Sequence, residues 1–353
     1  MKNCTLYILL FISTLTKAQD THFSMFHLAP LQLNPAYTGM HHAQMRLMAN
    51  ARNQWSPVLK SQAYNSYSAG VDFNYPVQKD YIGVGLSFLN DKAGTSSFKR
   101  DNAKLTLAYS KNLSGRKKKF HGLTAGFEAG VTSMGLDIDG LRFLQQFNAS
   151  DVFDKNLPAP NIQNEYRNLN FGDLGVGLTW ITVMPEYYSF HIGAAAHHIN
   201  RPNVSFLSLK TMLPRFTIDF GGEYFIQGKK WALLPNIVGM KQGKAVELNA
   251  GVALRKTLKW AKSESGYKAV QLGAWLRMNN KLDKKILADA LILFARMDYR
   301  QYTFGISYDS NISSLRLANA ANGSYEFAIH YTFDNVFPKR LSCPSAGSKH
   351  LHW

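Results

Sequence analysis

Apolar residues alternate with small or polar residues along most of this chain, in segments of roughly ten residues between Ala43 and Phe333. The stretch from Leu123 to Thr132 shows the pattern clearly. One set of alternate positions holds Leu, Ala, Phe, Ala and Val, and the other holds Thr, Gly, Glu, Gly and Thr. Successive side chains of a strand point to opposite faces, so one face is suited to hydrocarbon and the other to water. The pattern predicts a lipid-embedded β-barrel.

A soluble β-sandwich has the same period, but its outward positions are usually rich in Lys and Glu, whereas here the second face is small or polar. We therefore expect an all-β protein, a transmembrane antiparallel β-barrel of about 14 strands. An even number of strands places the two termini of the chain on the same side of the membrane. The predicted strands are residues 43–54, 63–75, 81–90, 102–112, 121–134, 171–183, 187–199, 213–227, 230–240, 245–256, 268–280, 286–299, 301–310 and 323–334.

The connections between these strands alternate in length, which orients the barrel. Those after the second, sixth, eighth and twelfth strands are tight, and short turns are typical of the periplasmic side. The opposite connections, expected to face outside, include residues 91–101, 135–170, 200–212 and 311–322. Aromatic residues favour membrane interfaces, and those expected to cluster near one pair of strand ends are Tyr64, Tyr67, Phe73, Tyr75 and Tyr81.

Residues 1–18 have the features of a secretory signal peptide. Lys2 provides the positive start, residues 6–15 the apolar run, and Thr16 and Ala18 the small residues before an expected cleavage at Gln19. No later stretch approaches about 18 consecutive apolar residues, so strands must do any spanning. Cys343 would be the only thiol of the mature protein, which excludes an internal disulfide. The predicted location is integral to the outer membrane.

Residues 19–42 fit neither a barrel strand nor a long helix, because Pro30, Pro35 and Gly39 interrupt them. A barrel of about fourteen strands is wide enough to conduct unless something fills it. We predict that this segment is a plug in the periplasmic mouth of a barrel formed by residues 43–334, followed by a periplasmic tail, 335–353. A floppy leader is less favourable, because its apolar groups would need cover. The plug residues are Phe23, Phe26, Leu33, Asn34, Pro35 and Tyr37.

The formal charge is +17, from 40 Lys and Arg against 23 Asp and Glu. The basic residues are spread along turns and polar faces, and an exported chain rarely meets nucleic acid, so we expect no nucleic-acid partner. Two clusters at connections of the same kind are either solvated turns against lipid headgroups or docking patches for an acidic periplasmic partner. They are Arg116, Lys117, Lys118 and Lys119, and Lys256, Lys259 and Lys262.

The sequence predicts no enzyme, no metal site and no cofactor. His191 and His197 share a face of one strand, but at about 3.3 Å per residue they lie about 20 Å apart, too far for one metal ion. No Ser lies in a Gly-x-Ser-x-Gly turn. Acidic side chains on different strands are instead expected to face the lumen and pair with arginines that brace it. The acids are Glu128, Glu223, Glu247 and Glu326, and the bases are Arg46, Arg255, Arg277, Arg296 and Arg300.

Glycines recur on successive strands and remove side chains from part of the inner wall. Taper or curvature of the barrel explains this, and the alternative is that the gap admits the N-terminal segment. The glycines are Gly83, Gly85, Gly126, Gly130, Gly175, Gly177 and Gly221.

Several motifs resemble those of the PorP/SprF family of the type IX secretion and gliding motility machinery. The most specific is the opening Asn34-Pro35-Ala36-Tyr37-Thr38-Gly39, preceded by Phe23-Ser24. Further matches are Arg52-Asn53-Gln54-Trp55, Asn90-Asp91-Lys92-Ala93-Gly94, Tyr308-Asp309, Gly323-Ser324-Tyr325-Glu326 and Cys343-Pro344, so that the resemblance covers nearly all of the mature chain. The family commonly ends shortly after its Cys-Pro, whereas residues 345–353 extend further here.

The resemblance implies a non-enzymatic accessory of secretion. Members are linked to the periplasmic ring of the machine and to a cognate cargo, typically an adhesin whose C-terminal signal domain is retained at the cell surface. An apolar outer loop is costly unless it packs on itself or on a partner, so we expect the loops 135–170 and 200–212 to form the cargo surface or an internal lid. The residues expected there are Leu141, Phe143, Phe147, Phe153, Tyr166, Phe206 and Leu209. The alternative function is a FadL-like channel for a hydrophobic small molecule.

Overall fold

The structure is a computed structural model that describes residues 20–60, 63–94, 98–114, 120–135, 146–147, 154, 157, 168–184, 187–204, 211–226, 230–259, 268–280, 286–313, 316 and 322–334. The predicted signal peptide 1–18, the tail 335–353 and the basic turn Arg116, Lys117, Lys118 and Lys119 lie outside the described residues, as does Lys262. So do all the residues predicted for the cargo surface except Phe147, which is half-buried.

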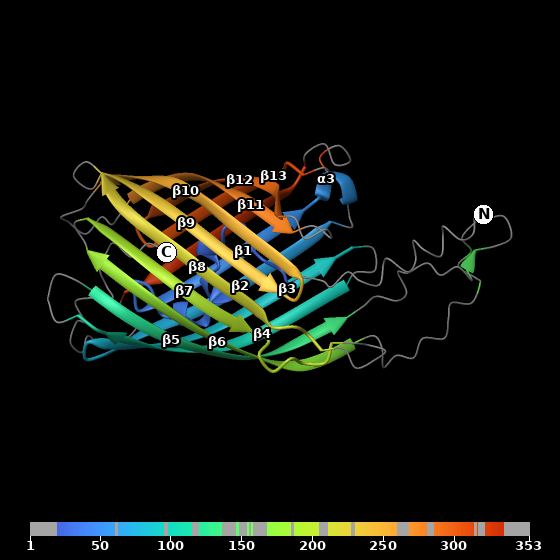
Figure 1. Ribbon diagram of the computed structural model, residues 1–353, viewed down its shortest axis with the longest axis horizontal. Helices are drawn as coiled ribbons and strands as arrows, with labels where there is room; N and C mark the ends of the chain where they lie inside the picture. Colours follow the sequence, from blue (N-terminus) through green and yellow to red (C-terminus); the bar gives the residue numbers. More distant parts are fainter. Residues whose placement is uncertain are drawn as a thin grey trace.

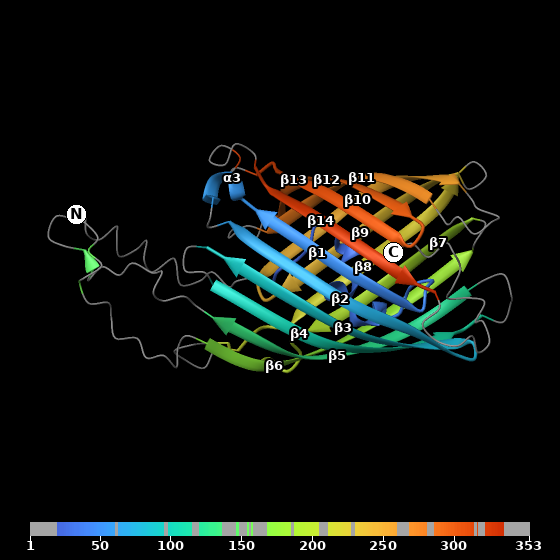
Figure 2. The same cartoon turned by 180° about the vertical axis from the view of Figure 1, so that it is seen from behind.

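Fourteen antiparallel strands form a closed barrel, in which each strand pairs with its neighbours in sequence and β1 pairs with β14 (Figures 1 and 2). The predicted fold class and strand number are confirmed. The strands are β1 (Met45–Gln54), β2 (Tyr64–Val77), β3 (Asp80–Ala93), β4 (Phe98–Asn112), β5 (Phe120–Gly135), β6 (Asn168–Met184), β7 (Tyr188–His197), β8 (Arg215–Ile226), β9 (Trp231–Gln242), β10 (Ala245–Lys259), β11 (Lys268–Asn280), β12 (Ile286–Tyr299), β13 (Tyr302–Asn311) and β14 (Ser324–Phe333).

Some strands extend beyond their predicted bounds. β4 begins at Phe98 instead of residue 102, and β10 runs to Lys259. Hydrogen bonding continues there although the apolar alternation has ended, because pairing depends on the neighbouring strand and not on hydrocarbon. Lys256 therefore lies within β10, opposite Trp231 and with its ammonium 5.0 Å from the indole ring centre, instead of in a turn.

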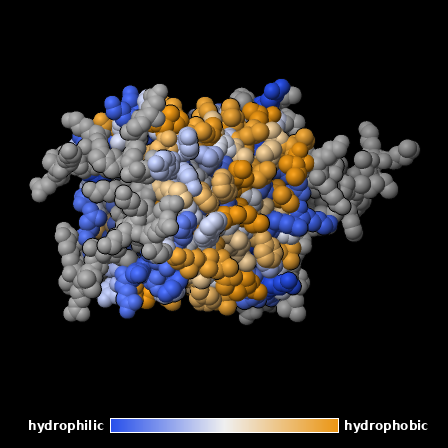
Figure 3. Space-filling view, turned by 60° about the vertical axis from the view of Figure 1, so that its left-hand side comes forward, coloured by the Kyte–Doolittle hydropathy of each residue, from blue (hydrophilic) through white to orange (hydrophobic). Residues whose placement is uncertain are grey.

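The outer face of the barrel carries the apolar set of the alternation. In β5, Leu123, Phe127 and Val131 are exposed by 45, 43 and 66%, whereas Thr124, Glu128 and Thr132 are buried on the inner side. Figure 3 shows apolar side chains gathered across the middle of the barrel, with strongly hydrophilic residues toward both ends. This belt is the surface expected of a barrel that sits in a bilayer.

The two ends of the barrel differ. We call the end where β1 finishes and β2 begins the long-loop rim, because the connections 136–167 and 198–214 lie there, and the other end the short-turn rim. The predicted cluster of aromatic residues at one interface is wrong. Tyr64 and Tyr67 lie toward the long-loop rim, but Phe73 and Tyr75 lie toward the other rim, because β2 runs unbroken between them. Tyr81 is 4% exposed and faces the lumen.

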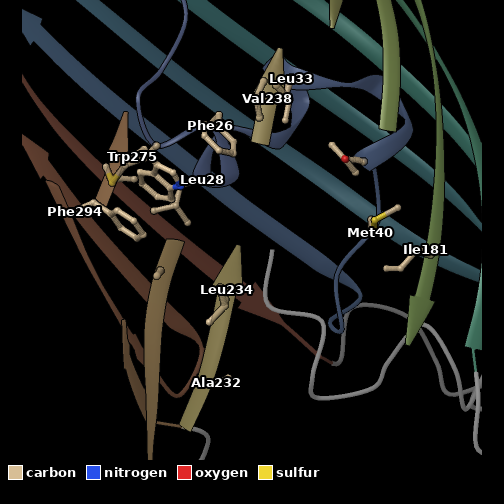
Figure 4. Close-up of a cluster of buried hydrophobic side chains, with 14 of the residues drawn as sticks. Phe26, Leu28, Leu33, Met40, Ile181, Ala232, Leu234, Val238, Trp275 and Phe294 are labelled. Carbon is tan, nitrogen blue, oxygen red and sulfur yellow. The ribbon is translucent and has the colours of Figure 1, made fainter. Parts of the chain in front are cut away.

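The named helices of the described residues are short: η2 (Phe26–Leu28), α2 (Pro30–Leu33), η3 (Pro35–Tyr37) and, beyond β1, α3 (Ser56–Leu59). Among the described residues, no helix is long and apolar enough to cross a membrane. Pro30 and Pro35 each stand at the first position of their helix, where the missing N–H costs nothing. The first three helices lie inside the barrel (Figures 1 and 4).

Candidate functional site: the filled lumen and the long-loop rim

The N-terminal segment, residues 20–44, passes through the lumen from one rim toward the other. At its start, Asp20 pairs with Arg100 near the beginning of β4, at the long-loop rim. At its end, the backbone N–H of Gln44 donates to Phe333 at the short-turn rim. The prediction that this segment occupies only the periplasmic mouth is wrong, because its hydrogen-bond partners are distributed over both halves of the inner wall.

The middle of the segment is fixed by the Asn-Pro-Ala-Tyr motif. The Asn34 side chain donates to the carbonyl oxygens of Leu178 and Ala194 at 3.2 and 3.3 Å, and its own Oδ1 accepts from the Ala36 N–H at 2.9 Å. The Tyr37 hydroxyl donates to the Asp219 carboxylate. Asn34 is completely buried, so its amide has partners on the wall in place of water. The motif thus ties the segment to three neighbouring strands, β6, β7 and β8.

Glycines on the inner wall make room for this segment. A Cβ on Gly83 would lie 2.1 Å from the Thr38 oxygen, one on Gly126 would lie 2.3 Å from the Ala36 nitrogen, and one on Gly177 would lie 1.9 Å from the Asn34 Oδ1. The space left by these three glycines admits the segment, as one of the two sequence interpretations held. Gly130 and Gly175 instead accommodate the side chains of Lys104 and Glu128.

Replacing Gly126 by Ala is expected to destabilise the barrel by about 1 to 3 kcal/mol, because the new methyl group would meet backbone atoms of Pro35 and Ala36 that have no flexible end to move. Thermal unfolding in detergent measures the effect. The matched control is Gly172→Ala, where a Cβ would meet one atom, the Gly130 oxygen, at 4.0 Å. Equal thermal midpoints for the two variants would show that the segment is not seated against β5.

Charged side chains surround the part of the segment nearest the long-loop rim. Asp309, which is completely buried, accepts hydrogen bonds from the Ser24 hydroxyl at 2.6 Å and from Arg277 at 2.9 Å, and pairs with Arg52 at 3.3 Å. The two carboxylate oxygens of Glu326 accept from the backbone N–H groups of Ser24 and Met25, at 2.7 and 3.0 Å. These bonds join the segment to β1, β11, β13 and β14.

A second charged cluster holds the other end of the segment. Arg46 and Asp72 form two hydrogen bonds, at 3.1 and 2.8 Å. The Asp72 carboxylate also accepts from the Gly39 N–H at 2.8 Å and lies 3.5 Å from His41. Gly39 has a φ of +72°, a left-handed conformation that glycine adopts without strain. The chain therefore turns into β1 at a position that this carboxylate fixes.

Acidic side chains do pair with basic ones across the lumen as predicted, but some of the acids have other partners than arginine. Glu223 does pair with Arg255. Glu128 instead accepts from Lys104 at 2.9 Å and contacts His197 at 2.7 Å.

Two of the predicted bracing residues also depart from the expectation. Glu326 binds the backbone of the segment in place of an arginine. Arg300 is exposed in the turn after β12, where its guanidinium lies 5.6 Å from the ring centre of Tyr299. The sequence pattern identified inward positions, but which inward neighbour is within reach depends on strand register.

Histidines are the site residues that sequence reasoning missed. His197, whose Nδ1 contacts Glu128, bonds through its Nε2 to the Leu33 carbonyl oxygen at 3.1 Å. The Nε2 of His330 bonds to the Leu28 carbonyl oxygen at 2.9 Å. His198 connects the Asp20 and Asp173 carboxylates, at 2.5 and 2.8 Å. These bonds connect the segment to the wall. The inward positions of His197 in β7 and His330 in β14 were the available signal, whereas His198 follows β7 with a φ of +58°, which the alternation does not predict.

At the long-loop rim, Asp20 and His198, which both lie outside the strands, form an ionic cluster with charged side chains of β4, β6 and β8. Burial opposes ionisation of Asp20, but the charge of Arg100 and the hydrogen bond of His198 outweigh it and hold the pKa of Asp20 well below its usual value. Burial likewise disfavours the imidazolium of His198, but hydrogen bonds to Asp173 and Asp20 raise its pKa above 6.5. The Asp20 carboxylate also lies 3.6 Å from Arg215. Both ionised forms are thus stabilised by their contact.

This cluster is expected to stabilise the fold most between about pH 4 and 6.5. The raised pKa of His198 makes its contribution complete below 6.5 and lost as the pH rises through the folded-state value. The lowered pKa of Asp20 makes its contribution complete above 3.8 and lost as the pH falls through the folded-state value. The measurement is the difference in thermal midpoint between the wild type and His198→Gln as a function of pH. A difference that increases above pH 7 would contradict the assignment.

Apolar side chains fill the lumen between the two charged clusters. Phe26 and Leu28 of the segment pack with Trp275 and Phe294 of the wall (Figure 4), and the two latter rings stack with centres 3.6 Å apart. A cavity beside Phe26, Leu33 and Tyr37 has a volume of about 30 Å³. That volume suits one or two water molecules and no larger ligand. Within the described ranges, no three His, Cys, Asp or Glu residues form a group that could hold a metal ion.

A closed antiparallel barrel with an apolar outer belt and a polar inner wall defines an outer-membrane β-barrel, and the protein is integral to that membrane. The family model described as type IX secretion system membrane protein PorP/SprF matches residues 15–331. The chain belongs to this family of type IX secretion system membrane proteins.

Other comparisons give only distant likenesses. No curated protein matches the chain. CdiB from Acinetobacter baumannii is similar with 7% identity, over 82% of this chain and 60% of its own, at a TM-score of 0.45. CdiB from Escherichia coli is similar with 9% identity, over 81% of this chain and 63% of its own, at a TM-score of 0.45. The chain thus spans less than two thirds of the CdiB chains.

The β domain of the Bordetella autotransporter BrkA is also similar, with 11% identity over 83% of this chain and all of its own, at a TM-score of 0.34. These likenesses concern barrel shape alone.

Proposed function

We propose that this protein is a non-enzymatic accessory of type IX secretion that binds the C-terminal signal domain of a cognate adhesin at the long-loop rim and retains it on the cell surface. The barrel serves as an anchor in the outer membrane, and the N-terminal segment is a plug that keeps it closed. Family membership supplies the secretion machine as the setting. The finer assignment to one cargo domain rests on the features below.

The single observation that carries the proposal is the filled lumen. Residues 20–44 cross the barrel and are held at both ends by buried carboxylates, Asp309 and Glu326 at one end and Asp72 at the other. A barrel whose lumen is filled does not admit cargo into its interior. Contacts with a secreted partner are then made at its rims and loops. The connections 136–167 and 198–214 at the long-loop rim are long, and loops commonly carry binding residues, which supports this rim as the side that meets a folded cargo domain.

The FadL-like alternative requires a continuous apolar pocket beyond the plug. The lumenal cavity beside Phe26 has a volume of about 30 Å³, whereas sites for drug-sized ligands measure about 300 to 1,000 Å³. In the part of the lumen that the structure describes, the packing therefore supports docking over transport of a hydrophobic molecule.

Affinity purification from the native outer membrane in mild detergent tests the proposal. The expected result is co-purification of a large surface adhesin with the wild type, and its loss when residues 141–157 are deleted. Heat-dependent migration in gels verifies that the variant barrel is folded. The control is a deletion of residues 345–353, which follow the last strand in the sequence. Recovery of the adhesin with the loop deletion at wild-type yield would contradict the loops as the cargo surface. Absence of any adhesin from the wild type would contradict the function.

A further inference from the structure

The outer face of the barrel contains a groove that the filled lumen does not explain. It crosses β13, β14, β1, β2, β3, β4 and β5 and reaches Asn170 of β6, and it has a volume of about 970 Å³. Most of these strands face the viewer in Figure 2. A second hollow of about 350 Å³ continues from it along β14, β1, β2 and β3. Both lie on the surface that the belt of apolar side chains marks as facing lipid.

Strand register explains why this surface is hollow. One row of outward positions runs Ile329, Ala49, Ala69, Phe88, Ala103 across five paired strands, and the next row runs Phe327, Ala51, Tyr67, Asn90, Asp101. Four alanines form the floor, and the large side chains stand around them. Phe88, Phe327 and Tyr67 are exposed by 51, 59 and 52%. Small residues at a membrane-facing surface permit close van der Waals contact with whatever lies against it.

A third row of outward positions follows these two toward the long-loop rim, and its side chains are polar and basic. It contains Asn53, Asn65, Lys92 and Lys99 as direct neighbours in register. Two lysines directly opposite each other on one face repel, which costs stability. Asp101 lies 2.7 Å from the Lys99 ammonium, and both side chains are about half exposed. Among the described residues, no carboxylate lies within ion-pair distance of Lys92, so the pair retains a net positive charge.

From this arrangement we propose that the groove is a binding site for an anionic membrane lipid, whose acyl chains lie over the four alanines and whose negatively charged headgroup lies against Lys92 and Lys99. The order of the rows matches the order of the parts of a lipid: chains toward the membrane centre, then the polar pair Asn90 and Asp101, then the lysines at the interface. The site does not depend on cargo binding, because the groove lies on the barrel wall and not on the loops.

Lipid retention by the full-length protein tests the proposal. The purified, delipidated barrel is titrated with dioleoyl phosphatidylglycerol or dioleoyl phosphatidylcholine, and bound lipid is counted by native mass spectrometry. We expect phosphatidylglycerol to bind about tenfold more tightly, since a lysine near a membrane surface contributes about fivefold toward an anionic lipid and one of the two is partly neutralised by Asp101. Equal retention of the two lipids would overturn the headgroup assignment.

Two pairs of variants separate the parts of the site. Lys92→Gln with Lys99→Gln is expected to abolish the preference for phosphatidylglycerol, whereas Lys241→Gln with Lys244→Gln, at the same rim but remote from the groove, is expected to preserve it. Ala69→Leu with Ala103→Leu is expected to reduce retention of both lipids several-fold, whereas Ala250→Leu with Ala274→Leu, on the outer faces of β10 and β11, is expected to leave it unchanged. All eight substituted side chains lie on the outer face of the barrel or in an exposed turn, so the fold is expected to persist.

Two further outcomes distinguish other occupants. Excess inorganic phosphate is expected not to displace phosphatidylglycerol, because it cannot fill the groove, and complete displacement would overturn the role of the acyl chains. A photo-reactive residue placed at Ala69 is expected to cross-link to lipid in the native membrane. Quantitative cross-linking to a polypeptide there would overturn the proposal in favour of a protein interface.

Discussion

Deletion of residues 20–42 is expected to convert the barrel from a closed anchor into an open channel. The segment occupies the lumen and is bonded to the inner wall from Asp20 to Gln44, and a barrel of about fourteen strands without a filler is wide enough to conduct ions. Planar bilayer recordings measure the effect. The wild type is expected to show no steady conductance, and the deletion variant is expected to show stable open steps.

If the deletion variant does not fold, a second variant tests whether the segment closes the barrel. Asn34→Ala combined with Tyr37→Phe removes the side-chain bonds to Leu178, Ala194 and Asp219 but retains the chain. We expect brief, flickering conductance from this variant, because the segment loses its anchor in the middle and keeps its ends. A wild-type protein that conducts as well as either variant would show that the segment does not close the barrel.

Asp309→Ala is expected to destabilise the barrel by about 3 to 5 kcal/mol, the effect of removing one partner from a buried ionic cluster. The substitution would leave Arg52 and Arg277 buried without their shared carboxylate and would release the Ser24 hydroxyl. The loss is measured as the change in unfolding free energy in denaturant titrations in detergent.

The matched control for this prediction is Asp101→Ala. Asp101 also pairs with a base, Lys99, at 2.7 Å, but both side chains are about half exposed. Exposed pairs contribute about 0 to 1 kcal/mol, so the control is expected to unfold almost as the wild type does. If the two variants lose similar stability, the ionic cluster around Asp309 does not stabilise the segment as argued.

Much of the barrel was predictable from local pattern. The alternation around Phe127 identified both faces of β5, because a strand has a period of two and a bilayer imposes opposite solvents on its two sides. The inward position of Glu128 followed from the same argument. Its partners did not, because Lys104 and His197 are brought to it by the register of β4 and β7 and by no feature of the neighbouring sequence.

The sequence by itself determined the strands, the lipid-facing side and the presence of a segment that is neither strand nor long helix, because each depends on residues close together in the chain. Tertiary structure alone decided the path of that segment from the long-loop rim to the short-turn rim, the seats that Gly83 and Gly126 provide for it, and the carboxylates that hold it. The reason is physical. A buried donor bonds to the nearest acceptor in space, and closing the barrel places Ser24 beside Glu326, separated by 302 residues in sequence.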